Sequence, residues 1–267
     1  MEKTLDSTVL ITGASKGIGL ALAEEFASHG HDLILVARGE QELTQVAQSL
    51  IKRSGVAVTT YVMDLTDNDA AQRLYDFVEA SGLTVDILVN NAGVGMSGSF
   101  DKGSYSSMTK MLQLNMLVLS QLTHLFLPSM LSREQGRILN LGSIVAYFTG
   151  APNWTAYVAS KHYVRAFTIG LARELKGTGV TATVVSPGAT PTDFVRTAGL
   201  TDMLAYRTVR GPSVAQIAKL SYRACLRGKV SVIPGGLNKV LAFLGELHPR
   251  QIAFEVFGIL SGKRVVS

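Results

Sequence analysis

Short runs of β-branched and aliphatic residues alternate with longer segments of helical periodicity along most of this chain. Turn residues bound the short runs, which predict strands at Thr8–Ile11, Leu33–Ala37, Ala57–Met63, Ile87–Val89, Arg137–Leu141, Val180–Val185 and Val230–Ile233. The longer segments predict helices near Ile18–Ser28, Glu40–Ser54, Asp67–Ala80, Tyr105–Leu127, Ala156–Leu175 and Ser213–Arg227. Regular alternation of this kind predicts an α/β fold, a doubly wound parallel sheet of about seven strands with helices on both faces.

The pattern changes after the last predicted strand. We expect one domain over residues 1–236, because no repeat, low-complexity tract or linker divides it. Residues 237–267 form an amphipathic segment, interrupted at Pro249, which we expect to pack as a helical extension on the same domain or on a sister subunit. A substrate lid and a membrane-surface contact are the two alternatives, and neither is favoured.

Composition narrows the class of protein. The chain has 267 residues, 47% of them hydrophobic, which is typical of a globular fold. The net charge of +5 is too small to indicate a nucleic-acid partner. Cys225 is the single cysteine and the five histidines have no ligand spacing, so we expect neither a disulfide nor a metal. With no apolar run near about 18 residues and no room for a secretory leader, we expect a cytoplasmic protein.

A glycine-rich loop joins the first strand to the first helix. Its glycines allow a tight turn and a close approach of the backbone to a pyrophosphate, while the helix amino end attracts the anion. This arrangement predicts a Rossmann-type dinucleotide site, with cofactor contacts at Gly13, Ser15, Lys16, Gly17, Ile18 and Gly19. The second strand ends at Ala37-Arg38, with no acid at its tip. Two cations, Lys16 and Arg38, and no carboxylate favour NADP(H) over NAD.

Three further residues have the spacing of an acid–base centre. Ser143 follows the fifth strand, and Tyr157 and Lys161 are four residues apart on a predicted helix, so they project from nearly the same face. A lysine cation favours the phenolate form of a tyrosine and brings it toward useful acid–base chemistry near neutrality. The phenol can then exchange a proton with a carbonyl or alcohol oxygen that the Ser143 hydroxyl orients.

Together these motifs resemble the short-chain dehydrogenase/reductase family, in its branch of about 250 residues, over roughly residues 7–233. The matching residues, in order, are Thr12-Gly13-x-x-x-Gly17-x-Gly19, Asp64 with Leu65, Asn90-Asn91-Ala92-Gly93, Asn115, Ser143, Tyr157-x-x-x-Lys161 and Pro187-Gly188. The Ala37-Arg38 pair resembles the NADP(H)-preferring subgroup. The resemblance also implies a homodimer or homotetramer built on the two long helices in the middle of the chain.

The resemblance assigns roles to single residues. The catalytic set would be Asn115, Ser143, Tyr157 and Lys161, with Asn115 bending its helix and placing a water in a proton relay to Lys161. Tyr157 would be the acid–base, and Lys161 would also hold the nicotinamide ribose. The other implied cofactor contacts are Asp64 and Leu65 at the adenine, Asn91 and Gly93 along the adenosine, and Pro187, Gly188, Thr190 and Thr192 toward the nicotinamide and phosphates.

The loops above the predicted site are rich in apolar side chains. Candidate pocket residues are Val145, Phe148, Trp154 and Phe194, with walls at Val94–Met96, Asn153-Trp154 and Phe194–Tyr206. Such a pocket favours a moderately hydrophobic substrate. We therefore expect an oxidoreductase that transfers a hydride between NADP(H) and a carbonyl or secondary alcohol. The alternatives are an NAD-linked dehydrogenase of a steroid- or polyol-type alcohol, and a non-catalytic regulator that senses NADPH.

Overall fold

A computed structural model describes residues 7–190 and 211–246 of the chain. Their centre is a seven-stranded sheet in the order β3-β2-β1-β4-β5-β6-β7, with every neighbouring pair parallel. The strands are β1 (Thr8–Thr12), β2 (Asp32–Ala37), β3 (Val58–Val62), β4 (Ile87–Asn90), β5 (Gly136–Leu141), β6 (Val180–Val185) and β7 (Ser231–Val232). The prediction of a doubly wound parallel sheet of about seven strands is confirmed. The strand order reverses between β1 and β4, and ligands of doubly wound sheets bind beyond the carboxyl ends of the strands at such a point.

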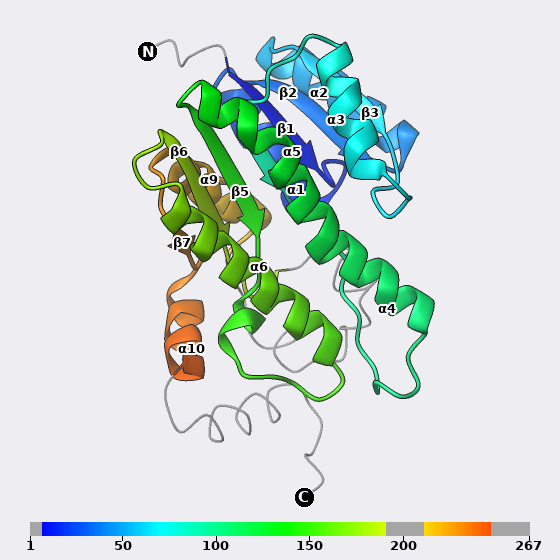
Figure 1. The fold of residues 1–267 in the computed structure, drawn as a ribbon, viewed down its shortest axis with the longest axis vertical. Helices are drawn as coiled ribbons and strands as arrows, with labels where there is room; N and C mark the ends of the chain where they lie inside the picture. The colour runs from blue at the N-terminus through cyan, green and yellow to red at the C-terminus, as the bar shows by residue number, and fades with distance from the viewer. Residues whose placement is uncertain (1–6, 191–210, 247–267) are drawn as a thin grey trace, which may run out of the picture.

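Helices cover both faces of the sheet (Figure 1). They are α1 (Gly17–Ser28), α2 (Glu40–Ser54), α3 (Ala70–Ala80), α4 (Tyr105–Leu112), α5 (Leu119–Ser132), α6 (Thr155–Glu174), α9 (Val214–Leu226) and α10 (Gly236–Glu246). The described residues also form two short helical segments, the π-helix η1 (Gln113–Val118) and the 3₁₀ helix η2 (Ile144–Tyr147). In Figure 1, α5 and α6 lie in front of the sheet, and α1 and α9 lie behind it.

Alternate residues of each central strand enter two different cores. In β1, Val9 and Ile11 pack with Phe26 of α1 on one face, whereas Leu10 packs with Leu74 of α3 on the other. The remaining central strands follow the same period of two, and their apolar residues are fully or nearly fully buried. Burial on both faces explains why these strands are continuous aliphatic runs in the sequence.

Three predicted boundaries are wrong, each for a local reason. The helix predicted from Asp67 begins at Ala70, because Asp69 adopts a left-handed conformation with φ of 55°. The helix predicted to end at Leu127 continues through Pro128 to Ser132, and this added turn buries Met130 in the core. The last strand shortens to two residues, since it pairs with β6 alone at the edge of the sheet.

The segment Tyr105–Ser132 forms one continuous helix of 28 residues through α4, η1 and α5. Its most apolar window of 18 residues has a mean hydropathy of 1.3, so by length and composition alone the helix could cross a membrane. The sequence did not predict a membrane-crossing helix, because polar residues interrupt its apolar runs. The same helix buries Val118, Leu122 and Phe126 against the sheet. Packing of this kind accounts for part of its apolar character, since 39% of that window is buried.

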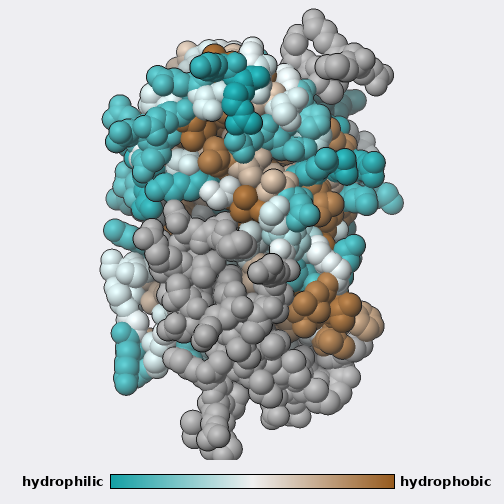
Figure 2. Space-filling view, turned by 180° about the vertical axis from the view of Figure 1, so that it is seen from behind, coloured by the Kyte–Doolittle hydropathy of each residue, from teal (hydrophilic) through white to brown (hydrophobic). Residues whose placement is uncertain are grey.

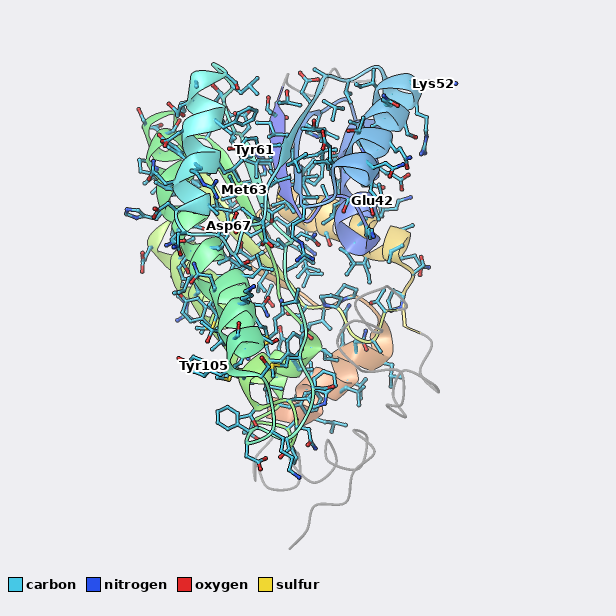
Figure 3. All side chains as sticks on the ribbon, turned by 90° about the vertical axis from the view of Figure 1, so that its right-hand side faces the viewer. Glu42, Lys52, Tyr61, Met63, Asp67 and Tyr105 are labelled. Carbon is cyan, nitrogen blue, oxygen red and sulfur yellow. The ribbon has the colours of Figure 1, made fainter. Side chains whose placement is uncertain are left out.

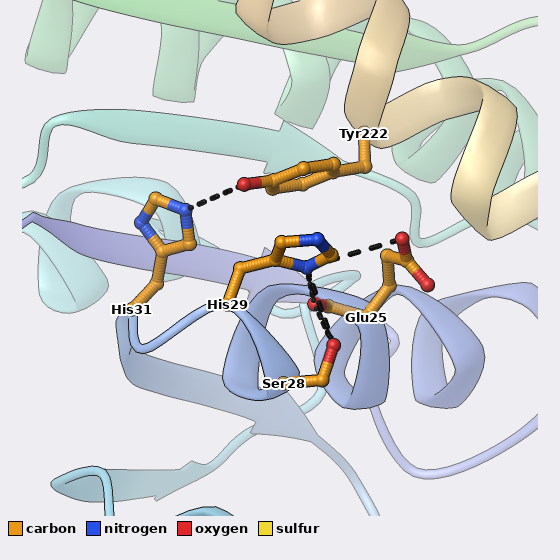
Figure 4. A network of polar contacts seen from close by, with 5 residues as sticks. All are labelled: Glu25, Ser28, His29, His31 and Tyr222. Carbon is orange, nitrogen blue, oxygen red and sulfur yellow. Dashed lines mark hydrogen bonds and ion pairs between the residues drawn. The ribbon is translucent and has the colours of Figure 1, made fainter. Parts of the chain in front are cut away.

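A polar cluster joins α1, β2 and α9 at the amino ends of the strands (Figure 4). The His29 ring stacks on Tyr222 with centroids 4.2 Å apart, and His31 Nε2 lies 3.4 Å from the Tyr222 hydroxyl. Burial lowers the pKa of His31, and the neighbouring His29 lowers it further.

Within the described residues, 7–190 and 211–246, no group of His, Cys, Asp and Glu side chains is arranged to hold a metal ion.

Candidate active site

The glycine loop wraps closely around the amino end of α1. Gly13 and Gly17 have φ of 66° and 57°, a conformation that other residues adopt only with strain. A Cβ on Gly19 would lie 2.1 Å from the backbone oxygen of Gly13, so no larger residue fits there. No described side chain caps the first turn of α1, whereas Ser213 and Gln216 form a full capping box on α9. The free N–H groups of α1 therefore suit an anion such as a pyrophosphate.

The Asn90–Gly93 segment after β4 is tied to this loop. The hydroxyl of Thr12 accepts hydrogen bonds from the backbone N–H groups of Asn91 and Ala92, at 3.1 and 3.0 Å. The Asn91 side chain donates to the backbone oxygens of Thr12 and Gly13, at 2.9 and 3.1 Å. Asn91, expected along the adenosine, thus holds the loop that would carry the cofactor phosphates. The sequence analysis assigned Thr12 no role of its own. A hydroxyl residue at the end of a buried strand was the feature that could have indicated one.

No acid stands at the tip of β2, but carboxylates from other elements pair with both cations. Lys16 Nζ lies 3.3 Å from Glu42 of α2, and Arg38 Nη1 lies 3.7 Å from Asp64. Figure 3 shows Glu42 on the first turns of α2, at the opposite end of that helix from Lys52. Both pairs are largely solvent-exposed, and such pairs are weak enough to exchange partners with a bound phosphate.

Asp64 follows β3 and is held in place by its neighbours. Its Oδ1 accepts hydrogen bonds from the backbone N–H and the hydroxyl of Thr66, each at 2.9 Å. Partial burial raises the pKa of Asp64, but the Thr66 hydrogen bonds and the charge of Arg38 outweigh it, and the pKa is lowered. Leu65 beside it is buried in the core on the α3 side of the sheet.

Lys161 carries a buried ammonium group in the middle of α6. Its Nζ donates a 2.9 Å hydrogen bond to the backbone oxygen of Leu141 at the end of β5, and it lies 5.9 Å from the centroid of the Tyr157 ring. Burial lowers the pKa of Lys161 to about 8. Residues four apart share a helix face, as the spacing predicts, so the phenol and the ammonium lie on the same side of α6.

Asn115 lies inside η1 and connects the site from the other side. Its Nδ2 donates to the backbone oxygen of Val94 and to the Ser160 hydroxyl, and its Oδ1 accepts from the Val94 N–H, all within 3.0–3.1 Å. A Cβ built on Gly93 would lie 3.1 Å from Asn115 Oδ1 and 3.7 Å from Lys161 Nζ. Asn115 and Lys161 therefore meet at Gly93. The bend expected at Asn115 coincides with the π-helical turn.

Ser143 follows β5 and is the N-cap of η2. Its Oγ accepts a hydrogen bond from the Val145 N–H at 3.3 Å, which leaves the hydroxyl hydrogen able to donate to another acceptor. The Ile144 N–H donates to the backbone oxygen of Pro187 at 2.9 Å and so ties η2 to the turn after β6. In that turn the Thr190 hydroxyl donates to the backbone oxygen of Gly188 at 3.0 Å. Thr192 lies outside the described residues.

A cavity of about 380 Å³ opens above Tyr157. Its wall is mostly apolar and aromatic, with one charged side chain, Asp101, among the described lining residues. The larger side chains in this lining, with the charged Asp101, are Met96, Phe100, Asp101, Tyr105, Met108 and Trp154. Figure 3 shows Tyr105 at the far end of the molecule from Lys52. Phe100 and Tyr105 are 67% and 77% exposed, so they form an apolar rim.

The candidate pocket residues fall in different places. Trp154 lines the cavity and packs edge-to-face on Tyr157, with ring centroids 5.7 Å apart. Val145 and Phe148 are buried behind it in the same apolar cluster. Phe194 and the wall Phe194–Tyr206 lie outside the described residues. Sequence reading missed the wall between Gly98 and Met108, where two exposed aromatic residues were the available signal.

Known proteins resemble this chain over nearly its whole length. The family model described as short chain dehydrogenase matches residues 7–202. A protein of Chromohalobacter salexigens named sulfoacetaldehyde reductase 2 is 37% identical over 263 residues, which cover 96% of this chain and 99% of that protein. The structure of a short-chain dehydrogenase from Sphingobium yanoikuyae in complex with NADPH is 30% identical, with a TM-score of 0.80 and 98% of each chain covered.

A second solved structure extends the comparison. The alcohol dehydrogenase of Comamonas testosteroni, described as specific for bulky-bulky ketones, is 27% identical, with a TM-score of 0.76. The match covers 98% of this chain and 96% of that one. The fold of this chain therefore has its counterpart in solved structures of known dehydrogenases. The chain belongs to the short-chain dehydrogenase/reductase family of oxidoreductases.

Proposed function

We propose that the protein is an NADP(H)-dependent carbonyl reductase, or the reverse alcohol dehydrogenase, for moderately hydrophobic substrates. The observation that carries this proposal is the position of Tyr157, which lines the 380 Å³ cavity and has the buried Lys161 ammonium 5.9 Å from the centre of its ring. A tyrosine that lines a substrate-sized cavity next to a cation suits proton exchange with a carbonyl oxygen.

In the proposed reaction, each residue has one task. The phenol of Tyr157 donates its proton to the carbonyl oxygen, while NADPH, when bound, supplies the hydride to the carbonyl carbon. Lys161 stabilises the negative charge that remains on the phenol oxygen. Ser143 donates its free hydroxyl hydrogen to the same substrate oxygen. Asn115 holds the Gly93–Val94 segment beside Lys161 and acts as a positioning residue.

The cofactor part of the proposal rests on the edge of the sheet near β2. Lys16 of the glycine loop and Arg38 after β2 are cations suited to an adenosine 2′-phosphate, and the structure from Sphingobium yanoikuyae is described as a complex with NADPH. The carboxylates of Glu42 and Asp64 form ion pairs with these two cations. That observation supports NAD(H) as the second candidate cofactor, because an acid near β2 favours a free ribose hydroxyl.

The substrate part rests on the lining of the cavity. Met96, Phe100, Met108 and Trp154 offer apolar contacts, and the single described charge is negative. A sulfonate such as that of sulfoacetaldehyde is bound most strongly by cations, and none of the described lining residues carries a positive charge. A bulky neutral ketone fits them better, and the Comamonas testosteroni enzyme is described for that class.

We also propose that the protein is cytoplasmic and forms a homodimer or homotetramer. Light scattering would measure its oligomeric state.

The first experiment measures cofactor binding and turnover together. Nicotinamide fluorescence during separate titrations with NADPH and NADH gives both affinities, and a panel of ketones of graded bulk then tests oxidation of the bound cofactor. We expect tighter binding of NADPH and faster oxidation with bulky neutral ketones. The Tyr157→Phe variant should bind NADPH normally and lose at least about 100-fold in turnover. Binding without turnover across the panel would favour the NADPH-sensing alternative, and binding of neither cofactor would reject the proposal.

A further inference from the structure

Helix α10 makes close contact with the turn after β6 through a buried asparagine. Asn238 is 4% exposed and donates a 2.6 Å hydrogen bond to the backbone oxygen of Pro234. A Cβ placed on Gly188 would lie only 2.4 Å from Asn238 Oδ1 and 2.6 Å from its Nδ2. The amide of Asn238 therefore packs flat against the backbone of the Pro187-Gly188 turn, and only glycine fits at position 188.

The next turns of α10 contact η2 in the same close manner. Ala242 is buried against Ala146 and Tyr147, which lie in η2. A Cβ on Gly245 would lie 2.5 Å from the backbone oxygen of Tyr147 and 3.0 Å from the Phe148 ring. Small residues on this face of α10 thus allow the helix to approach the backbone of η2.

A cation from α6 completes the contact. Arg165 forms an ion pair with Glu246 at the end of α10, and its guanidinium lies 3.9 Å above the Tyr147 ring. Its Nη1 donates to the backbone oxygen of Ala146 at 3.4 Å. η2 is therefore held between α6 on one side and α10 on the other.

The opposite face of α10 makes no comparable contact with the described residues. Its large apolar side chains are about half to two-thirds exposed, at Leu237, Val240, Phe243 and Leu244. Figure 2 shows a hydrophobic patch on this side of the molecule, where Figure 1 places α10. The described residues of α10 that approach the active site are the small or polar Asn238, Ala242 and Gly245, together with Leu241, which packs on the apolar cluster of Trp154 and Tyr157.

We propose that α10 is a brace for the nicotinamide side of the active site, with Asn238 and Gly245 as positioning residues. The two segments that it touches are joined by the hydrogen bond from the Ile144 N–H to the Pro187 oxygen. One of them begins with Ser143, and the other is the Pro187-Gly188 turn. The brace sets their mutual position, and with it the place of the Ser143 hydroxyl. This inference rests on the proposed reductase function.

Two glycines of the same helix provide a matched test. Gly245→Ala adds a Cβ that must displace η2, whereas Gly236→Ala adds the same group where nothing lies within 4 Å. We expect Gly245→Ala to lower kcat by about 10- to 100-fold and to weaken NADPH binding, since small displacements of positioning groups are costly in catalysis. Gly236→Ala should match the wild-type protein in both.

A fragment of the cofactor separates positioning from general loss of structure. Adenosine 2′,5′-bisphosphate contains the half that would bind the glycine loop and Arg38, far from α10. Its affinity should be the same in Gly245→Ala, Gly236→Ala and the wild-type protein. If the fragment and NADPH weaken equally, or if folded Gly245→Ala keeps the kcat and NADPH affinity of Gly236→Ala, the brace is rejected.

A second variant covers the case in which Gly245→Ala fails to fold. Asn238→Ala removes the amide that packs on Gly188, and it introduces no overlap. We expect a smaller fall in kcat, about threefold to tenfold, and faster backbone hydrogen exchange at Ile144, whose N–H bonds to Pro187. Unchanged exchange at Ile144 would overturn the brace even in a protein with no turnover. Faster exchange in a protein that binds neither cofactor would instead reject only the proposed function.

Discussion

The cofactor half and the substrate half of the site are built from different materials. Around the glycine loop, backbone groups contact backbone and short polar side chains, as in the bonds from Asn91 to Thr12 and Gly13. Around the cavity, long apolar and aromatic side chains form the wall. The first half tolerates almost no change in volume, whereas the second can change its lining without altering the fold. A family can therefore keep one cofactor site and vary its substrates.

The largest expected effect tests the tight half. Gly19→Ala places a Cβ 2.1 Å from the Gly13 oxygen, so the loop must open and the N–H groups lose their common direction. We expect NADPH affinity to fall more than about 100-fold, as measured by nicotinamide fluorescence. Gly170→Ala on α6, where nothing lies within 4 Å, is the control and should bind NADPH normally while gaining a few tenths to about 1 kcal/mol in stability. Normal NADPH binding by Gly19→Ala would contradict a phosphate site at this loop.

Lys161→Met tests the junction of the two halves. Turnover should fall by at least about 100-fold, because no cation remains beside the phenol. The variant should nevertheless be more stable than the wild-type protein, because burial of the ammonium costs stability. That cost appears as a pKa of Lys161 lowered from 10.5 to about 8. Between these values the unfolded chain binds more protons than the folded one, so wild-type stability rises with pH and the penalty is fully present below pH 8.

The measurement is the difference in Tm between Lys161→Met and the wild-type protein at pH 7.5 and pH 9.5. We expect the wild-type protein to gain relative to the variant as the pH rises. The lost hydrogen bond to the Leu141 oxygen reduces the advantage of the variant but adds no pH dependence. Lys176→Met, which removes an exposed lysine, is the control and should show no such trend. A Tm difference that is constant with pH would contradict a buried ammonium.

Asp101→Lys tests how far the substrate half can be changed alone. It reverses the single charge among the described lining residues, which should raise the ratio of kcat/KM for sulfoacetaldehyde over acetophenone by about tenfold. NADPH affinity should stay constant. Asp76→Lys makes the same charge change on α3, outside the cavity lining, and should leave the ratio unaltered. An equal change in both variants would mean that overall charge, and not the cavity, sets the preference.

The two halves also differ in how well the sequence predicts them. The glycine loop and the Tyr157–Lys161 face depend on local spacing along one strand or one helix, so both could be predicted. The pairing of Lys16 with Glu42 could not, because it requires α2 to lie beside the glycine loop once the sheet has formed. The burial of Asn238 was hidden as well, since a polar residue on an amphipathic helix is normally predicted to face solvent. The part of the wall from Gly98 to Ser104 is an irregular loop with no periodicity to interpret.

The smallest expected effect concerns the cations at the edge of the cofactor half. A hydrogen bond from its own backbone N–H and the charge of Lys16 lower the pKa of Glu42, which is therefore a carboxylate near neutral pH. Glu42→Gln removes that charge and frees Lys16 for an adenosine 2′-phosphate. We expect NADPH to bind a few-fold more tightly and NADH to be unaffected, with the gain fading at high salt because the site is exposed.

Glu40→Gln, on the same first turn of α2, removes an equal charge without touching the Lys16 pair. If both variants improve NADPH binding equally, the general potential matters and the pairing does not; if Glu42→Gln improves NADH instead, the cations do not serve a 2′-phosphate.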